Sequence, residues 1–146
     1  LFRSITVPGN SRLPITVGAY DHRNNSIYIH SSRGYISRDS VKPDLAAPGV
    51  DVLGPANTSV HSGILKNTQT FTHRTGTSAA AAITAGAVAN LLNWGIVMGN
   101  YPTMSEASIK SYLIRGASRN PSLSYPNREF GYGTLDLLQT FLKLRE

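Results

Sequence analysis

Ser78 is the residue of this chain whose type and position best suit a nucleophile. It follows Gly76 and Thr77 and opens a long run of alanines and other apolar residues that predicts a helix. The first turn of a helix leaves backbone N–H groups without partners and carries partial positive charge. A Ser hydroxyl there lies beside donors that could stabilise a developing oxyanion. Ser and Thr are also favoured helix N-caps, so the pattern alone favours capping by Ser78 or Thr77 over catalysis.

A serine nucleophile needs a general base, and the chain contains four histidines. His73 stands five residues before Ser78, and His61 lies in a long polar stretch. His22 and His30 lie around the second predicted strand. The carboxylates that could orient an imidazole are Asp21, Asp44 and Asp51. One nearby His among four is expected by chance, so we expect no internal Ser–His pair. No pair of these residues stands at ligand spacing on a predicted helix and Cys is absent, so we expect no metal, no cofactor and no thiol nucleophile.

The charge of the chain is basic but not clustered. Fourteen Lys and Arg residues against eight Asp and Glu give a net charge of +6 and a pI near 9.9. The basic residues are spread along the sequence, and no basic run alternates with aromatic residues. Nucleic-acid binding is therefore disfavoured. The remaining explanation is a fragment whose acidic complement lies elsewhere in a larger protein.

Three short segments rich in β-branched and aromatic residues predict strands. They are residues 13–20, 26–31 and 44–53, the last broken at Pro48-Gly49. The polar stretch 54–75 that follows is long for a structureless connection. It predicts either a functional loop or a hairpin.

Three helices are predicted in the second half of the chain. The first spans about residues 78–95, and Tyr101-Pro102 ends the apolar run. The second begins at a capping box over residues 103–106 and runs to about Gly116. The last carries an apolar stripe made of Leu135, Leu138, Phe141 and Leu142. Strands followed by helices favour an α/β or α+β fold.

Residues 79–98 form an apolar run about as long as a membrane crossing. The run contains Thr84, Asn90 and Asn93, and its first half is alanine rather than leucine, so we expect a buried core helix and no membrane span. The chain begins with Leu1 and lacks the pattern of a signal peptide. We therefore expect it to begin inside a larger product or after a cleavage.

The run Gly76-Thr77-Ser78-Ala79-Ala80 resembles the Gly-Thr-Ser-x-Ala run that carries the nucleophile of subtilisin-like serine peptidases, the subtilases. Three further segments resemble the same family in the same order: residues 7–19, residues 31–34 with 42–49, and residues 130–133. The resemblance covers essentially the whole chain. The local sequences around Ser32, Ser78 and Phe130 are similar to those of subtilases from clostridia and related anaerobes. Those subtilases include proteins of the spore-germination group.

This resemblance implies a doubly wound α/β catalytic domain with a mostly parallel sheet, of which residues 1–146 form the C-terminal portion. It implies that Ser78 is the nucleophile of an endopeptidase and that its backbone N–H is one oxyanion donor. The substrate-binding residues it implies are Thr6, Val7, Pro8 and Gly9 along the S1 pocket, with Arg74, Thr75, Gly76 and Thr77 beside the nucleophile.

The chain departs from the family pattern at two positions near Ser78. Thr75 stands where an Asn is usual, and Ala82-Ile83 stands where Pro-His is common. Neither position supplies a catalytic proton, so both concern packing. The stretch between Pro48 and Gly76 is longer than in the simplest members, which predicts an enlarged loop on the leaving-group side.

The family's catalytic Asp and His, and the Asn that completes its oxyanion hole, precede every segment matched here. This chain would then carry one triad member of three. We expect it to be inactive alone and to need two partners: the N-terminal half of the same protein and a peptide or protein substrate. The alternative is a catalytically inactive subtilase relative used for binding or regulation, although the retained Ser78 argues against it. A bacterial cell-envelope or secreted location is favoured over the cytoplasm.

Overall fold

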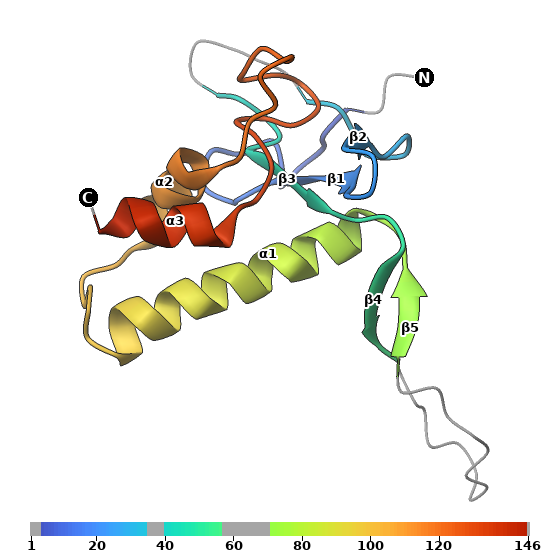
Figure 1. Cartoon of the computed structure of the whole chain (residues 1–146). Helices are drawn as coiled ribbons and strands as arrows, with labels where there is room; N and C mark the ends of the chain where they lie inside the picture. The colour runs from blue at the N-terminus through green and yellow to red at the C-terminus, as the bar shows by residue number, and fades with distance from the viewer. Residues whose placement is uncertain (1–3, 35–39, 57–70, 146) are drawn as a thin grey trace, which may run out of the picture.

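The computed structural model describes residues 4–34, 40–56 and 71–145 (Figure 1). The strands are β1 (Val17–Asp21), β2 (Ser26–Ile27), β3 (Leu45–Pro48), β4 (Val52–Pro55) and β5 (Phe71–Arg74). The helices are α1 (Thr77–Leu92), continued by the π-helical turn η1 (Asn93–Val97), then α2 (Glu106–Gly116) and α3 (Leu137–Leu144). The mixed α/β class predicted from the sequence is confirmed.

The central sheet has the order β2-β1-β3. β1 and β3 are parallel, with Val17 opposite Leu45 and Tyr20 opposite Pro48, whereas β2 is antiparallel to the end of β1. The outer edge of β3 is covered by a segment from near the end of the chain. There the Leu135 N–H donates to the Ala46 carbonyl (2.8 Å), and the Ala46 N–H donates to the Gly133 carbonyl (2.9 Å). Parallel pairing is therefore present at the centre of a small mixed sheet.

The predicted strands are shorter than expected. Only the second half of residues 13–20 is in β1, and just before it the Thr16 N–H donates to the Asp44 carboxylate instead of to a strand carbonyl. The expected break at Pro48-Gly49 is confirmed, since it separates β3 from β4. The polar stretch contains part of a hairpin, with Val52 opposite Arg74 and Pro55 opposite Phe71. Residues 57–70, including His61, lie outside the described residues.

α1 begins at Thr77, one residue before the predicted start, and packs against β1 and β3 (Figure 1). Its buried stripe is made of small residues and one leucine: Ala80, Thr84, Ala87 and Leu91. Most of its remaining surface is exposed in this chain, so the predicted core helix is buried along one face. The run Thr77–Val97 is long and apolar enough to cross a membrane by length and composition, with a mean hydropathy of 1.5. Its packing on the sheet is that of a core helix.

The two C-terminal helices correct details of the sequence prediction. The capping box of α2 is formed by Ser105 and Ser108, not by Thr103 and Glu106. In α3 the side chains that pack on the core are Leu137, Phe141 and Leu144, whereas Leu138 and Leu142 of the predicted stripe are exposed. The two helices approach closely where α2 ends. A Cβ at Gly116 would lie 2.5 Å from Thr140 Cα.

A buried ionic cluster, which we call the amino-end cluster, lies where β1 and β3 begin. The Lys42 Nζ lies 2.8 Å from Asp44 Oδ2, and the Lys110 Nζ of α2 lies 2.8 Å from Asp44 Oδ1. Lys42 also donates to the Pro14 carbonyl (2.9 Å) and the Thr16 hydroxyl (3.2 Å). Lys42 and Asp44 side chains are 1% and 3% exposed, so the cluster joins the loop before β1 to β3 and α2 inside the core.

Candidate active site

The turn between β5 and α1, residues 75–78, is called here the Ser78 turn. It contacts the residues that follow the carboxyl end of β3. Gly76 is the helix N-cap, with φ of 147°, in a region that favours glycine. Its carbonyl accepts the first helical hydrogen bonds from the N–H groups of Ala79 (3.1 Å) and Ala80 (3.4 Å). Thr77 and Ser78 are therefore the first two residues of the helix, and both are exposed.

The structure removes the capping explanation for the two hydroxyl residues. The N-cap is a glycine and makes no side-chain capping bond, so neither Thr77 nor Ser78 caps α1. Within the described part of the chain, the Ser78 hydroxyl has no hydrogen-bond partner. The backbone N–H groups of Thr77 and Ser78 have no intrahelical acceptor, as the geometry of a first turn requires. Ser78 is left as an exposed hydroxyl beside unpaired donors.

The turn is attached to the residues that follow β3. The Gly76 N–H donates to the Gly49 carbonyl (2.7 Å), and the Asp51 N–H donates to the Thr75 hydroxyl (2.9 Å). Gly49 is closely packed as well. A Cβ added there would lie 2.6 Å from the Ala19 Cβ and 2.9 Å from the Gly76 carbonyl oxygen. The position of the Ser78 turn therefore depends on contact with the core of the sheet.

An exposed ionic network, which we call the carboxyl-end network, lies on the same side of the sheet. Asp51 contacts His73 Nδ1 (2.9 Å) and the Arg23 guanidinium (2.9 Å), and Arg23 contacts Asp21 at the end of β1 (3.1 Å). The hydrogen bonds from Arg23 hold the pKa of the Asp21 carboxyl below its usual value. These contacts connect the end of β1 to strand β5, which leads into the Ser78 turn.

The described histidines do not pair with Ser78. The His73 imidazole is directed to Asp51, His30 packs edge-on against Tyr28 with ring centroids 5.2 Å apart, and His22 is exposed. In the described ranges no hydrogen bond joins an imidazole to the Ser78 hydroxyl. The same ranges contain no group of three or more His, Asp or Glu side chains that could hold a metal ion.

Comparison with known proteins decides the family. The sequence model of the Subtilase family matches residues 2–133. The chain belongs to the subtilase family. Serine protease AprX of Bacillus subtilis (strain 168) is 30% identical over 128 residues, which are 80% of this chain and 27% of AprX. Subtilisin-like protease SBT6.1 of Arabidopsis thaliana is 30% identical over 148 residues, which are 97% of this chain and 13% of that protein.

The solved structure of the Clostridium perfringens CspB protease is similar to this subtilase chain over nearly its whole length. The TM-score is 0.84 at 35% identity, covering 96% of this chain and 28% of CspB. This agrees with the clostridial likeness expected from the sequence. The chain spans about a quarter of the length of AprX and of CspB, and less of SBT6.1. The parent activity of the family is that of a serine endopeptidase.

The structure places the predicted substrate-binding residues of this subtilase chain in two separate places. Arg74, Thr75, Gly76 and Thr77 lead directly into Ser78, and the Arg74 side chain is exposed. Thr6, Val7, Pro8 and Gly9 form a turn before β1, and the Thr16 hydroxyl donates to the Gly9 carbonyl (2.6 Å). Gly9 is thus tied to the amino end of β1, whereas Ser78 lies beyond the carboxyl end of β3. Four residues of strand, roughly 13 Å, separate those two ends.

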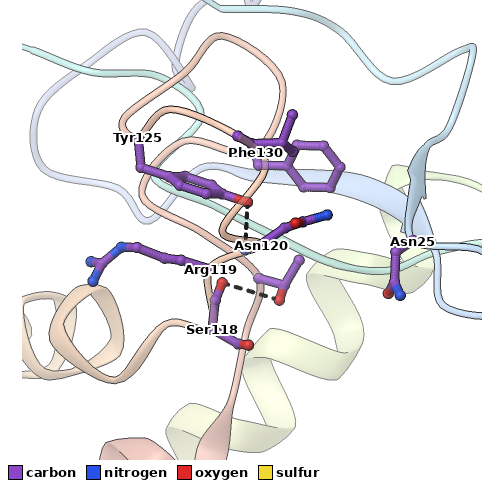
Figure 2. A pocket seen from close by; sticks show the side chains of 8 residues that line it. Asn25, Ser118, Arg119, Asn120, Tyr125 and Phe130 are labelled. Atoms are coloured by element: carbon purple, nitrogen blue, oxygen red, sulfur yellow. Dashed lines mark hydrogen bonds between the residues drawn. The ribbon is translucent and has the colours of Figure 1, made fainter.

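A hollow of about 230 Å³ lies between the β1–β2 turn and the loop after α2 (Figure 2). The Tyr125 hydroxyl points into it and accepts from the Asn120 N–H (3.2 Å). Arg119 points away, because its guanidinium donates to the carbonyls of Tyr132 and Ile114. The lining residues are Asn25, Ser118, Arg119, Asn120, Leu123, Tyr125, Phe130 and Thr134. None belongs to the Ser78 turn, so this hollow is separate from the candidate active site of the subtilase chain.

Sequence reasoning missed the residues that hold the Ser78 turn in place. The sequence predicts Thr75 as a substrate-binding residue and as a departure from the family pattern, but it does not connect Thr75 with Gly49 and Asp51. The available signal was the pair of glycine turns, Pro48-Gly49 and Thr75-Gly76, at the two ends of the long stretch between β3 and α1. Such a pair suggests a hairpin whose ends meet.

Proposed function

We propose that this chain is the nucleophile-bearing portion of a serine endopeptidase and that Ser78 is its nucleophile. The observation that carries the proposal is an exposed hydroxyl on the second residue of α1, with no capping role, in the sequence run that carries the family nucleophile. The 16-residue helix directs its partial positive charge and free N–H groups toward the same place. Such donors favour the charge of a tetrahedral intermediate.

In the proposed reaction the Ser78 Oγ forms a bond to the scissile carbonyl carbon, and the Ser78 proton passes to a histidine. The carbonyl oxygen becomes an oxyanion and accepts a hydrogen bond from the Ser78 backbone N–H. The histidine then returns the proton to the leaving amine as the peptide C–N bond breaks, which leaves an acyl-enzyme. Water releases the acyl group and restores the Ser78 hydroxyl. The exposed Arg74 would contact residues on the leaving-group side of the substrate.

The proposal requires groups beyond the described residues. A base, an aspartate that orients it and a second oxyanion donor would come from the N-terminal half of the same catalytic domain. That half is the proposed partner of this chain, and a peptide or protein, bound in extended form, is the proposed substrate. We place the intact protein in a bacterial cell envelope or outside the cell, in line with the subtilase resemblance.

The first test uses the intact protein with a fluorophosphonate probe and a peptide-hydrolysis assay. We expect Ser78→Ala to abolish labelling and to lower kcat by several orders of magnitude. In subtilisin, loss of the nucleophile costs on the order of 10⁶ in kcat. Ser111→Ala is the matched control, because Ser111 is an exposed hydroxyl on α2, outside the proposed machinery. Labelling at another residue, or full activity in Ser78→Ala, would refute the assignment.

The second test uses residues 1–146 alone. Without an imidazole base the Ser78 hydroxyl remains a weak, neutral nucleophile, so we expect hydrolysis no faster than background. Robust hydrolysis by the isolated chain would instead assign a base to His73 or His61. An intact protein that shows no activity and no labelling would favour the inactive binding or regulatory relative.

A further inference from the structure

We propose that Thr75 is a positioning residue that fixes the orientation of the Ser78 turn by accepting a hydrogen bond from the Asp51 backbone. This inference rests on the proposed role of Ser78 as nucleophile. The role proposed here acts through the Ser78 backbone and is separate from the substrate-binding role that the family resemblance implies for Thr75. Its hydroxyl oxygen lies 2.9 Å from the Asp51 nitrogen.

Two adjacent hydrogen bonds hold the turn against the end of β3. One joins the Thr75 hydroxyl to Asp51, and the other joins the Gly76 N–H to the Gly49 carbonyl at 2.7 Å. They continue the β4–β5 ladder past its last pair, Val52 and Arg74. We call this pair of bonds the turn clamp. It connects Gly49 and Asp51 on one side to the two residues that lead into α1 on the other.

The turn clamp is anchored in rigid structure. Gly49 directly follows β3 and is packed so closely on Ala19 of β1 that a Cβ would come within 2.6 Å of the Ala19 Cβ. Asp51 has a φ of 54°, a left-handed conformation that Asp adopts more readily than most residues. Movement of the turn therefore requires movement relative to the central strands.

Thr75 makes the one side-chain hydrogen bond of the Thr75–Ser78 turn within the described residues. Gly76 has no side chain, and neither Thr77 nor Ser78 caps the helix. Because Thr75 is exposed, its hydrogen bond competes with water and adds little to global stability. We expect this hydrogen bond to matter for the position of Ser78, since a misplacement of about 1 Å at a reacting group can cost on the order of 100-fold in rate.

Asp51 takes part in two separable interactions. Its backbone N–H belongs to the turn clamp, whereas its carboxylate contacts His73 and Arg23. Asp51→Asn keeps the backbone bond and a residue suited to positive φ, and it removes only the charge. This variant therefore separates the turn clamp from the carboxyl-end network.

The experiment compares Thr75→Val, Thr75→Ser and Asp51→Asn in the intact protein. Valine keeps the branched shape and loses the acceptor, and serine keeps the acceptor. We expect Thr75→Val to lower kcat and the rate of fluorophosphonate labelling by roughly 10- to 100-fold, with KM and Tm nearly unchanged. Thr75→Ser should restore most of the rate, and Asp51→Asn should stay within about threefold of the starting protein.

Full kcat in Thr75→Val, or an equal loss in Thr75→Ser, would overturn the positioning role. If Thr75→Val is not recovered folded, Thr75→Ala against Thr75→Ser gives the same comparison. Ser78→Ala keeps the two hypotheses apart. An active Ser78→Ala variant refutes the proposed nucleophile, whereas an inactive one beside a fully active Thr75→Val variant refutes the turn clamp alone.

Discussion

Two groups of charged side chains lie at opposite ends of the parallel pair β1 and β3, and they differ in how far they are exposed to solvent. In the amino-end cluster the Lys42 and Asp44 side chains are 1% and 3% exposed, and Lys110 is 19% exposed. In the carboxyl-end network the Arg23, Asp51 and His73 side chains are 45–60% exposed. One grouping therefore exchanges water for protein partners, and the other keeps much of its hydration.

The difference assigns the two ends of the sheet to different tasks. Burial lowers the pKa of the Lys42 ammonium, and its hydrogen bond to Asp44 opposes that shift. A buried charge is tolerated only while its partners remain, so the amino-end cluster makes the fold depend on each member. Exposed pairs contribute little to stability and can adjust. The carboxyl ends of parallel strands are where α/β folds place their ligand sites, and the exposed carboxyl-end network lies at that end.

The largest expected effect comes from breaking the buried cluster. Lys42→Met should lower the free energy of unfolding of the intact protein by about 3–5 kcal/mol, because Asp44 loses one of its two cations inside the core. Urea denaturation measures the change. Lys42→Met combined with Asp44→Leu should recover part of the loss, since the second change removes the uncompensated carboxylate. A loss below about 1 kcal/mol for the single variant would show that the cluster behaves like a surface pair.

The next effect tests the close contact that links the sheet to the Ser78 turn. Gly49→Ala should cost about 1–3 kcal/mol, because its Cβ would overlap with Ala19 and the Gly76 carbonyl. It should also lower the labelling rate of Ser78, since the turn must move. Gly54→Ala is the matched control. Nothing lies within 4 Å of a Cβ at Gly54, and a change within about 0.5 kcal/mol is expected there.

Breaking the exposed network should have a smaller effect. Arg23→Gln removes contacts to both Asp21 and Asp51 and should lower Tm only slightly, because exposed ion pairs contribute little to stability. Salt at about 1 M shortens the screening length to roughly 3 Å and should remove most of the difference. Thermal unfolding at low and high salt measures both values. A difference that persists at high salt would contradict the picture of a hydrated network.

The smallest effect is the acid response of Asp21. Its pKa in the folded protein is lowered from 3.8, first by the side-chain hydrogen bond from Arg23. The unfolded state then binds more protons in this range, so the stabilisation is present above pH 3.8 and is lost as the pH falls through the folded pKa. The difference in urea midpoint between the starting protein and Asp21→Asn should shrink below that pH. A difference that grows on acidification would reverse the sign of the pKa shift.

Local features of this fold were predictable from sequence. The start of α1 near Ser78 follows from a glycine before an alanine-rich run, and the break between β3 and β4 follows from Pro48-Gly49. The family, and with it the candidate nucleophile, followed from four ordered segments. Each of these signals lies within a few neighbouring residues.

The remaining features depend on residues far apart in the sequence. Lys42 lies only two residues before Asp44, but nothing local marks Lys110 of α2 as the second partner of the same carboxylate. The exposure of Leu138 and Leu142 depends on how α3 meets α2, and two stripes of similar hydrophobicity compete at that spacing. The role of the Thr75 hydroxyl could not be predicted, because its donor, the Asp51 N–H, lies 24 positions earlier in the sequence.

The covering of β3 by the segment around Thr134 has a consequence for biosynthesis. Ala46 and Thr134 are bridged, although 88 residues of chain separate them. At about 5–20 residues per second, a ribosome needs roughly 4–18 s to make that interval. During that time one edge of β3 has unpaired N–H and C=O groups, which can template pairing with another chain. We therefore expect the nascent β3 edge to be a site of wrong pairing with other chains until residues 133–135 have been made.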